Sequence, residues 1–263
     1  MQAKNLTNGR RGQVDVVILC GGLGSRLAGI VNDRPKPMAQ MDGRPFLDIL
    51  IDYFSGFGFR RFVLCAGHRS EVIQEHYSRR SDLLEFVVSN EPFPLGTAGA
   101  VKNAEVLLKS DSFLVTNGDS FCPADLTEFY DFHSAKHALM SMVVIESEDI
   151  KDSGLVTVNG CQRIIGFEEK ACRRQGRYVN AGIYLFQREI LSLIPASMKY
   201  SLEYDLFPKL VAKGAFAFVT SGPLIDIGTP ERYESAKDFF YKHSAGCAEA
   251  SFAAASCVRE RRN

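Results

Sequence analysis

A run of β-branched residues that stops abruptly at glycine constrains the fold more than any other feature of this sequence. Residues 14–20 read VDVVILC, and Gly21 and Gly22 follow directly. A short, continuous apolar run is typical of a strand that is buried on both faces of a parallel sheet. The glycines mark the point where the backbone turns away from the sheet. The chain is therefore expected to begin its folded part with a strand of an α/β sheet.

Helix-like and strand-like patterns alternate after this strand. Helices are expected at residues 46–57, 70–77, 97–108 and 125–137, and further strands at residues 61–66, 84–89, 113–117 and 139–145. Such alternation indicates β-α-β units. The fold class predicted is α/β, with a Rossmann-like, doubly wound mixed sheet that is mostly parallel.

Short strands replace this alternation from residue 154 onward. They are expected at residues 155–158, 163–167 and 178–186, with Asn159 and Gly160 forming a turn between the first two. They predict a small antiparallel addition that builds a second wall beside the sheet. The chain then returns to helices at residues 202–212 and 230–241 and to strands at residues 216–219 and 223–227.

Length and composition favour one domain without a global electrostatic field. The 263 residues suit a single domain at residues 14–242, between a flexible segment at residues 1–13 and a tail at residues 243–263. The 31 basic and 31 acidic residues cancel, which argues against binding to nucleic acid or to an anionic membrane. The polar start of the chain does not resemble a signal peptide, and the seven cysteines lack a C-x-x-C pair, so a cytoplasmic protein with free thiols is expected.

The loop after the first strand carries the features of a phosphate-binding loop. It reads GGLGSRL, and a PKP segment follows. Glycines let the backbone N–H groups approach phosphate oxygens, and Arg26 and Lys36 supply positive charge. A generic strand-to-helix turn is the alternative. A dinucleotide-binding turn is disfavoured by the bulky Leu27, and a P-loop by the absence of G-K-[ST].

Two aspartates end strand-like segments in positions that suit a metal. Asp119 follows Asn117 and Gly118 after the strand at residues 113–117, and Asp226 lies in LIDIGTP. In an open α/β sheet, ligands bind at the carboxyl ends of the strands. Two carboxylates could hold one Mg²⁺ and leave coordination positions for phosphate oxygens and water. Each aspartate taken alone is also a common turn former or helix cap.

A third group of polar residues suits a sugar phosphate. Glu169 and Lys170 lie in an EEK segment, and Asn180 and Gly182 lie in YVNAG. A carboxylate accepts sugar hydroxyls, an ammonium neutralises a phosphate, and an asparagine offers both donors and acceptors. Without further context these residues could equally be a charged turn and a strand with one polar position.

Taken in order, these motifs resemble the sugar nucleotidyltransferase family over residues 14–242. Within that family the segments VNDRPKPM, EPFPLGTAGA, SLEYDLFP and DIGTPERY look most like heptose-1-phosphate guanylyltransferases. The resemblance departs from the family pattern at Ala171, where the family usually has proline. It implies an enzyme that joins D-glycero-α-D-manno-heptose 1-phosphate to GTP for surface polysaccharide synthesis. Mannose-1-phosphate guanylyltransferase and glucose-1-phosphate thymidylyl- or uridylyltransferase remain alternatives, as does a non-catalytic regulatory subunit that binds a sugar nucleotide.

The resemblance also assigns residues to roles. Catalysis is assigned to Arg26, Lys36 and Asp119, and the metal ligands of a Mg²⁺ ion are Asp119 and Asp226. The sugar phosphate is assigned to Glu169, Lys170, Asn180 and Gly182, and the antiparallel addition becomes the sugar-binding part of the fold. The nucleotide is assigned to Gly21, Gly22, Gly24, Arg26, Glu91, Gly96, Thr97, Asn117 and Gly118. GTP and a sugar 1-phosphate are the expected partners, and a homo-oligomer stays open.

Glu91 is expected to determine which nucleotide base binds. Guanine presents two neighbouring donors, N1–H and N2–H₂, to which an ionised carboxylate offers two acceptors. Similar thymidylyl enzymes tend to carry glutamine at this place. The alternative is that Glu91 ends a strand and faces water.

Overall fold

The computed structural model describes residues 11–22, 27, 33–80, 83–147, 154–170 and 178–244. Gly24 and Arg26 of the glycine loop lie outside these residues. So do Ala171, residues 1–10 and residues 245–263.

The first half of the chain forms the parallel part of a mixed sheet. Strand β1 (Asp15–Leu19) pairs in parallel with β4 (Arg61–Ala66) and with β6 (Ser112–Asn117), and β4 pairs with β5 (Glu85–Asn90). The connecting helices are α2 (Phe46–Gly56), α3 (Ser70–Ser78) and α4 (Gly96–Asn103). Strands and helices thus alternate as the sequence predicts, and the doubly wound α/β fold is confirmed.

The second half adds mainly antiparallel strands to the same sheet. Strand β11 (Tyr178–Gln187) runs between β6 and β8 (Met140–Glu146) and is antiparallel to both. The remaining strands are β9 (Leu155–Val158), β10 (Ile164–Glu168) and β12 (Ala215–Thr220), which pairs in parallel with β8. The short antiparallel strands were expected to form a second wall beside the sheet. This placement is wrong, because β9 joins the main sheet by pairing with Tyr178 and Val179 of β11.

The helical region at residues 202–214 differs from the single helix expected at residues 202–212. Residues Leu202–Leu206 form a π-helical turn, η5, and α6 (Phe207–Gly214) follows it. Pro208 lies in the first turn of α6 and has no N–H to continue a regular helical ladder from η5, so α6 begins here. The expected helix at residues 97–108 similarly ends early, and a 3₁₀ turn, η3 (Glu105–Leu107), completes it.

Smaller elements complete the fold. They are α5 (Leu126–Lys136), α7 (Pro230–Ser244), the 3₁₀ turns η2 (Lys36–Met38) and η4 (Arg188–Leu193), and the short strand pairs β2 (Gln40–Met41) with β3 (Arg44–Pro45) and β7 (Ser120–Phe121) with β13 (Ile225–Asp226).

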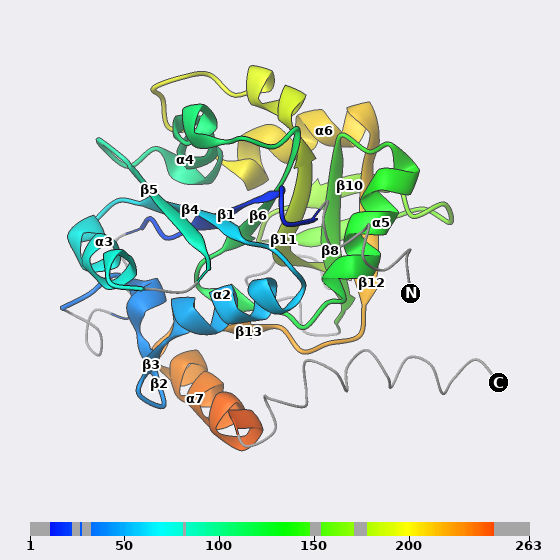
Figure 1. Ribbon diagram of the computed structural model, residues 1–263. Coiled ribbons are helices and arrows are strands. Elements are labelled where there is room, and N and C mark those ends of the chain that lie inside the picture. Colours follow the sequence, from blue (N-terminus) through cyan, green and yellow to red (C-terminus); the bar gives the residue numbers. More distant parts are fainter. Residues whose placement is uncertain are drawn as a thin grey trace.

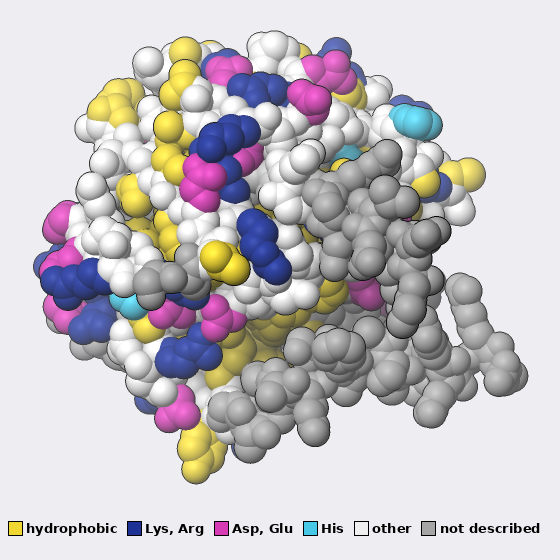
Figure 2. Space-filling view, in the orientation of Figure 1, with side chains coloured by type: hydrophobic (Ala, Val, Ile, Leu, Met, Phe, Trp, Pro, Cys, Tyr) yellow, Lys and Arg dark blue, Asp and Glu magenta, His cyan; other side chains and the backbone are white. Residues whose placement is uncertain are grey.

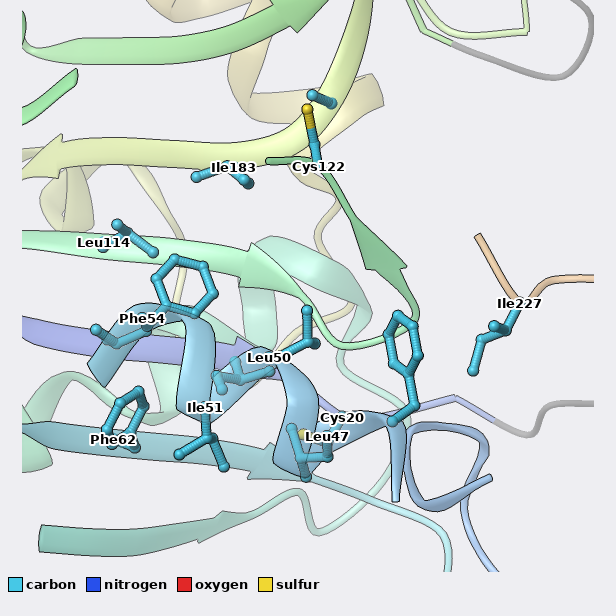
Figure 3. Packing of buried hydrophobic residues seen from close by; sticks show 14 of the residues in the cluster. Cys20, Leu47, Leu50, Ile51, Phe54, Phe62, Leu114, Cys122, Ile183 and Ile227 are labelled. Carbon is cyan, nitrogen blue, oxygen red and sulfur yellow. The ribbon is translucent and has the colours of Figure 1, made fainter. Parts of the chain in front are cut away.

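Side chains alternate along the central strands and fill two cores. Ile18 of β1 belongs to the core under α2, whereas Val17 belongs to the core under α4 and α6. Figure 1 shows α4 and α6 above the sheet and α2 below it. In Figure 3, Leu50 and Phe54 of α2 lie between this helix and the strands. Burial on both faces explains why the strands read as continuous apolar runs.

The visible surface mixes charges of both signs. Figure 2 shows basic and acidic side chains interspersed over the upper part of the molecule, while hydrophobic side chains gather below, near α2 and α7. Within the described residues, no helix combines the length and the apolar character that crossing a bilayer requires.

A buried histidine links α5 to the sheet. His133 of α5 is 1% exposed, and its Nδ1 lies 2.9 Å from Oγ of Ser141 in β8. Its Nε2 lies 3.2 Å from Nε2 of Gln187, which can donate to it only if the ring is neutral. Burial lowers the pKa of His133 to about 4.

This histidine should make stability depend on pH. The unfolded chain binds a proton near pH 6.5, whereas the folded protein resists protonation until about pH 4, so the free energy of unfolding falls as the pH drops between these values. We expect the stability difference between wild type and His133→Gln to shrink over that range in urea titrations. Because the carboxylates are common to both proteins, a difference that stays constant from pH 8 to pH 4 would contradict this assignment.

Candidate active site

The carboxyl ends of β1 and β6 are held together by one hydrogen bond. Gly118, directly after β6, donates its N–H to the carbonyl oxygen of Leu19 in β1 at 3.0 Å. A Cβ atom at position 118 would lie 2.6 Å from that oxygen, so only glycine allows the approach. This bond places Asp119 next to the start of the glycine loop, where Gly22 has a φ of +112° that favours glycine.

Lys36 and Asp119 form an ion pair at this edge. Lys36 begins η2, and its Nζ donates to Oδ2 of Asp119 at 2.7 Å. The backbone of Asp119 is fixed as well, because its carbonyl oxygen accepts from Ile227 N–H at 3.0 Å. Residues 83 positions apart in the sequence are thus brought together.

Asp226 is brought to this edge by the pairing of two short strands. Strand β13 is antiparallel to β7, and this register sets Asp226 opposite Ser120, the neighbour of Asp119. A Cβ atom at Gly228 would lie 2.8 Å from Oδ1 of Asp226 and 3.9 Å from Nζ of Lys36. The carboxylate of Asp226 and the ammonium of Lys36 therefore both lie close to Gly228.

Asp226 also acts as a turn former. Its Oδ1 accepts from Gly228 N–H at 2.8 Å, and its Oδ2 accepts from Nη1 of Arg232 at 3.0 Å. Arg232, in the first part of α7, is a neighbour of the site that sequence reasoning missed. The quoted segment DIGTPERY contains it, but its spacing alone does not indicate which carboxylate it contacts.

The two aspartates fit a hard divalent cation that is completed by a substrate. Oδ1 of Asp119 receives no hydrogen bond from any described residue, and oxygen is the ligand atom that Mg²⁺ prefers. Among the described residues, no group of three or more His, Cys, Asp or Glu side chains is arranged to hold a metal by itself. Phosphate oxygens and water would have to supply the remaining ligands, as is usual for Mg²⁺ at phosphate-transfer sites.

Glu91 lies against Gly21, at the start of the glycine loop. It follows β5, and a Cβ atom at Gly21 would overlap its carboxylate. Its Oε2 accepts from Leu95 N–H at 3.1 Å, while Oε1 receives no hydrogen bond from the described part of the chain. Burial raises the pKa of Glu91. This carboxylate is half-buried at the sheet edge. The alternative expectation from the sequence was that it faces water.

A break in β11 brings two predicted residues against β6. The ladder between β11 and β8 shifts register between Asn180 and Tyr184, and Gly182 there has a φ of +75°. Oδ1 of Asn180 accepts from Gly182 N–H at 2.9 Å, and its Nδ2 donates to the buried Tyr184 hydroxyl at 2.8 Å. Asn117 packs directly on the open face of Gly182.

Glu169 lies just after β10, beside this break. Burial raises its pKa, and the charge of Glu203 adds to the effect, while Lys170 opposes it. No described residue donates a hydrogen bond to its carboxylate, so both oxygens are left for a ligand. Glu203 lies in η5, and it received no role from the sequence although the quoted segment SLEYDLFP contains it.

Gly96 and Thr97 are the first two residues of α4. Gly96 has a φ of +73°, and a Cβ atom there would lie 2.7 Å from the carbonyl oxygen of Tyr200. The side-chain hydroxyl of Thr97 is bonded to residues 202 and 203. Of the residues assigned from the sequence, only Gly24 and Arg26 fall outside the described chain.

Gly182→Ala should disturb both the strand and the site. The new Cβ would lie 2.7 Å from Nδ2 of Asn117, in a backbone conformation that alanine disfavours. We expect a loss of about 1–3 kcal/mol in the free energy of unfolding, together with reduced activity. Gly160→Ala is the matched control, because nothing lies within 4 Å of the Cβ position there. Equal stability of the two variants in denaturant titrations would refute the steric argument.

Comparison with known proteins agrees with this geometry. The family model described as nucleotidyl transferase matches residues 15–243. The D-glycero-alpha-D-manno-heptose 1-phosphate guanylyltransferase of Campylobacter jejuni is 33% identical over 220 residues, covering 84% of this chain and 97% of that protein. The mannose-1-phosphate guanylyltransferase of Mycobacterium tuberculosis is 32% identical over 225 residues, covering 84% of this chain but 63% of that longer protein.

A solved structure is similar over the same region. The crystal structure of HddC from Yersinia pseudotuberculosis complexed with GMP-PN matches with a TM-score of 0.75 and 33% identity, covering 86% of this chain and 99% of that chain. The chain therefore belongs to the nucleotidyl transferase family, among the sugar-1-phosphate nucleotidyltransferases.

Proposed function

We propose that this protein transfers GMP from GTP to a sugar 1-phosphate, with D-glycero-α-D-manno-heptose 1-phosphate as the sugar substrate. A phosphate oxygen of the sugar 1-phosphate attacks the α-phosphorus of GTP. The bond between the α-phosphorus and the bridging oxygen breaks, and pyrophosphate leaves. The products are a GDP-sugar, for surface polysaccharide synthesis, and pyrophosphate.

The observation that carries this proposal is the meeting of Lys36, Asp119 and Asp226 at the carboxyl edge of the sheet. Lys36 supplies positive charge where the α-phosphate would lie, and Gly22, with nothing within 4 Å of its Cβ position, leaves room for the phosphates. Arg26 is expected to add a second cation. Because the attacking phosphate is already an anion, the protein needs to position the two substrates and to offset negative charge.

Asp119 and Asp226 are the residues that would hold a Mg²⁺ ion. The ion would offset charge on the phosphates of GTP when bound. Lys36 forms an ion pair with Asp119, and Arg232 forms one with Asp226.

The nucleotide base is assigned to the side of the site that Glu91 occupies. Its free Oε1 and partly occupied Oε2 offer acceptors to the N1–H and N2–H₂ donors of guanine. Gly96 and Thr97 would border the same pocket through their backbone, and Asn117 and Gly118 would border the ribose and phosphates. The guanylyltransferase names of the relatives support this choice.

The sugar phosphate is assigned to the break in β11 and the end of β10. Glu169 offers two free acceptors to sugar hydroxyls, Lys170 a charge to the phosphate, and Asn180 and Gly182 a polar strand edge. Mannose 1-phosphate is the second candidate, because a relative 32% identical to this chain carries that name. A non-catalytic sugar-nucleotide-binding subunit is disfavoured, since Lys36 and Asp119 are both present and paired.

Pyrophosphate release tests this function directly. We expect release with GTP, Mg²⁺ and one of the heptose, mannose or glucose 1-phosphates, and a loss of about a hundredfold or more in Asp119→Asn, which replaces a charged Mg²⁺ ligand with an amide of nearly equal size. Asp131→Asn, on an exposed position of α5, is the matched control and should keep full activity. The proposal fails if wild type releases no pyrophosphate with any sugar 1-phosphate, and the assignment of Asp119 fails if the folded variant keeps wild-type turnover.

Glu91→Gln should weaken the preference for GTP. An amide offers one acceptor and one donor where the carboxylate offers two acceptors, so one guanine donor would face a donor. We expect kcat/KM for GTP to fall by about 10- to 100-fold, with use of UTP or dTTP unchanged or improved. The three nucleotides are compared in both proteins. An unaltered ranking would show that other groups recognise the base.

A further inference from the structure

Two cations pair with the two aspartates at the carboxyl edge of the sheet. Nζ of Lys36 donates to Oδ2 of Asp119 at 2.7 Å, and Nη1 of Arg232 donates to Oδ2 of Asp226 at 3.0 Å. Lys36 is assigned to the phosphates of GTP. Arg232 has no role in the proposed reaction, although it contacts one of the two aspartates that would hold the metal.

The stability of the fold does not account for an arginine at position 232. Arg232 is the third residue of α7, and the N-terminal end of a helix carries partial positive charge, which disfavours a cation there. The ion pair of Arg232 and Asp226 is also partly exposed to water, where such a pair contributes little to the free energy of unfolding. The pair is therefore better explained by its effect on the carboxylate of Asp226.

The carboxylate of Asp226 is held at both of its oxygens. Gly228 N–H donates to Oδ1 at 2.8 Å, and Arg232 donates to Oδ2. The terminal torsion of an aspartate side chain is broad, so a carboxylate with one partner can rotate, whereas two partners fix its plane. An ionised carboxylate has about four lone-pair sites, so each oxygen can still bind a cation. Asp226 thus has one orientation and retains the capacity to bind a metal.

Arg232 is itself fixed by the start of α7. Its N–H donates to Oγ1 of Thr229 at 3.3 Å, and Tyr233 N–H donates to the carbonyl oxygen of Thr229 at 2.8 Å. The hydroxyl of the buried Tyr233 donates to the carbonyl oxygen of Gln40 in β2 at 2.7 Å. Figure 1 shows α7 close to β2 and β13, and it contacts both. The helix therefore anchors Arg232 next to β13, the strand that carries Asp226.

Oδ1 of Asp226 is close to the other half of the metal site. It lies 2.8 Å from the position that a Cβ atom would take at Gly228, and Nζ of Lys36 lies 3.9 Å from the same position. Lys36 in turn is bonded to Asp119. Hydrogen-bond partners that orient a metal ligand from behind commonly strengthen metal binding by about 10- to 100-fold, because the ligand is already in place when the metal arrives.

We propose that Arg232 is a positioning residue that orients the metal ligand Asp226. The inference rests on the proposed function, because it requires the metal that Asp119 and Asp226 would hold. By holding Oδ2, Arg232 keeps the carboxylate in the orientation in which Oδ1 is near Lys36. Arg232 takes no part in the transfer of GMP itself.

Calorimetry with a GTP analogue measures this role without turnover. The analogue carries a methylene group between its α- and β-phosphates, which this reaction cannot cleave, and its affinity is measured with Mn²⁺ and without divalent metal. Wild type should bind the analogue more tightly with Mn²⁺. Arg232→Gln should reduce this enhancement by about tenfold, while its affinity without metal stays within about twofold of wild type. Arg232→Lys, which keeps the charge and a donor, should retain most of the enhancement.

Lys237→Gln is the matched control in the same helix. Lys237 pairs with Glu234 at 2.9 Å along α7 and makes no printed contact with the aspartates of the site, so its loss should leave both affinities unchanged. The proposal is overturned if Arg232→Gln keeps the full Mn²⁺ enhancement, or if Lys237→Gln loses as much of it as Arg232→Gln does.

Thermal unfolding and turnover separate the remaining explanations. Without metal, Arg232→Gln should not lower Tm, because a cation is unfavourable at the start of a helix. A lowered Tm would indicate a structural role and would overturn the proposal. Absence of any Mn²⁺ enhancement in wild type would reject both this role and the metal site of the proposed function. Absent turnover in wild type with the enhancement intact would reject only the proposed reaction.

Discussion

The hydrogen bond between Gly118 N–H and the carbonyl oxygen of Leu19 is the contact on which the site depends most. It joins the carboxyl ends of two central parallel strands at a distance that a side chain at position 118 would prevent. Asp119 consequently leaves β6 toward Lys36, which is the first residue of η2. Gly118, which this backbone contact requires, thus determines where the carboxylate of Asp119 lies.

The remaining parts of the site are arranged around this contact by long-range pairing. The antiparallel pair β7 and β13 delivers Asp226, and the break in β11 at Gly182 delivers Asn180. The pairing of Tyr200 with the start of α4 brings η5 to the same edge. Each of these contacts joins segments that are distant in the sequence, so the site forms only when the whole sheet has formed.

The sequence predicted local structure better than it predicted these long-range contacts. Strand β4 begins and ends at the residues expected, because its apolar run is bounded by clear signals. The placement of β9 in the main sheet could not be predicted, because strand patterns do not specify which edge a strand will join. Asp119 was predictable as the end of a buried strand, whereas the hydrogen bond between Thr97 and Glu203 joins residues 106 positions apart and was not predictable from either segment.

We propose that one edge of the sheet holds a metal between Asp119 and Asp226 and a sugar beside Glu169. Crystals grown with Mn²⁺ and GDP-mannose test both positions, because anomalous diffraction locates the metal and the electron density locates the sugar ring. We expect an anomalous peak in contact with the carboxylates of Asp119 and Asp226, and the mannosyl ring in contact with the carboxylate of Glu169. A metal peak remote from both aspartates, or a sugar ring bound away from Glu169, would contradict this arrangement.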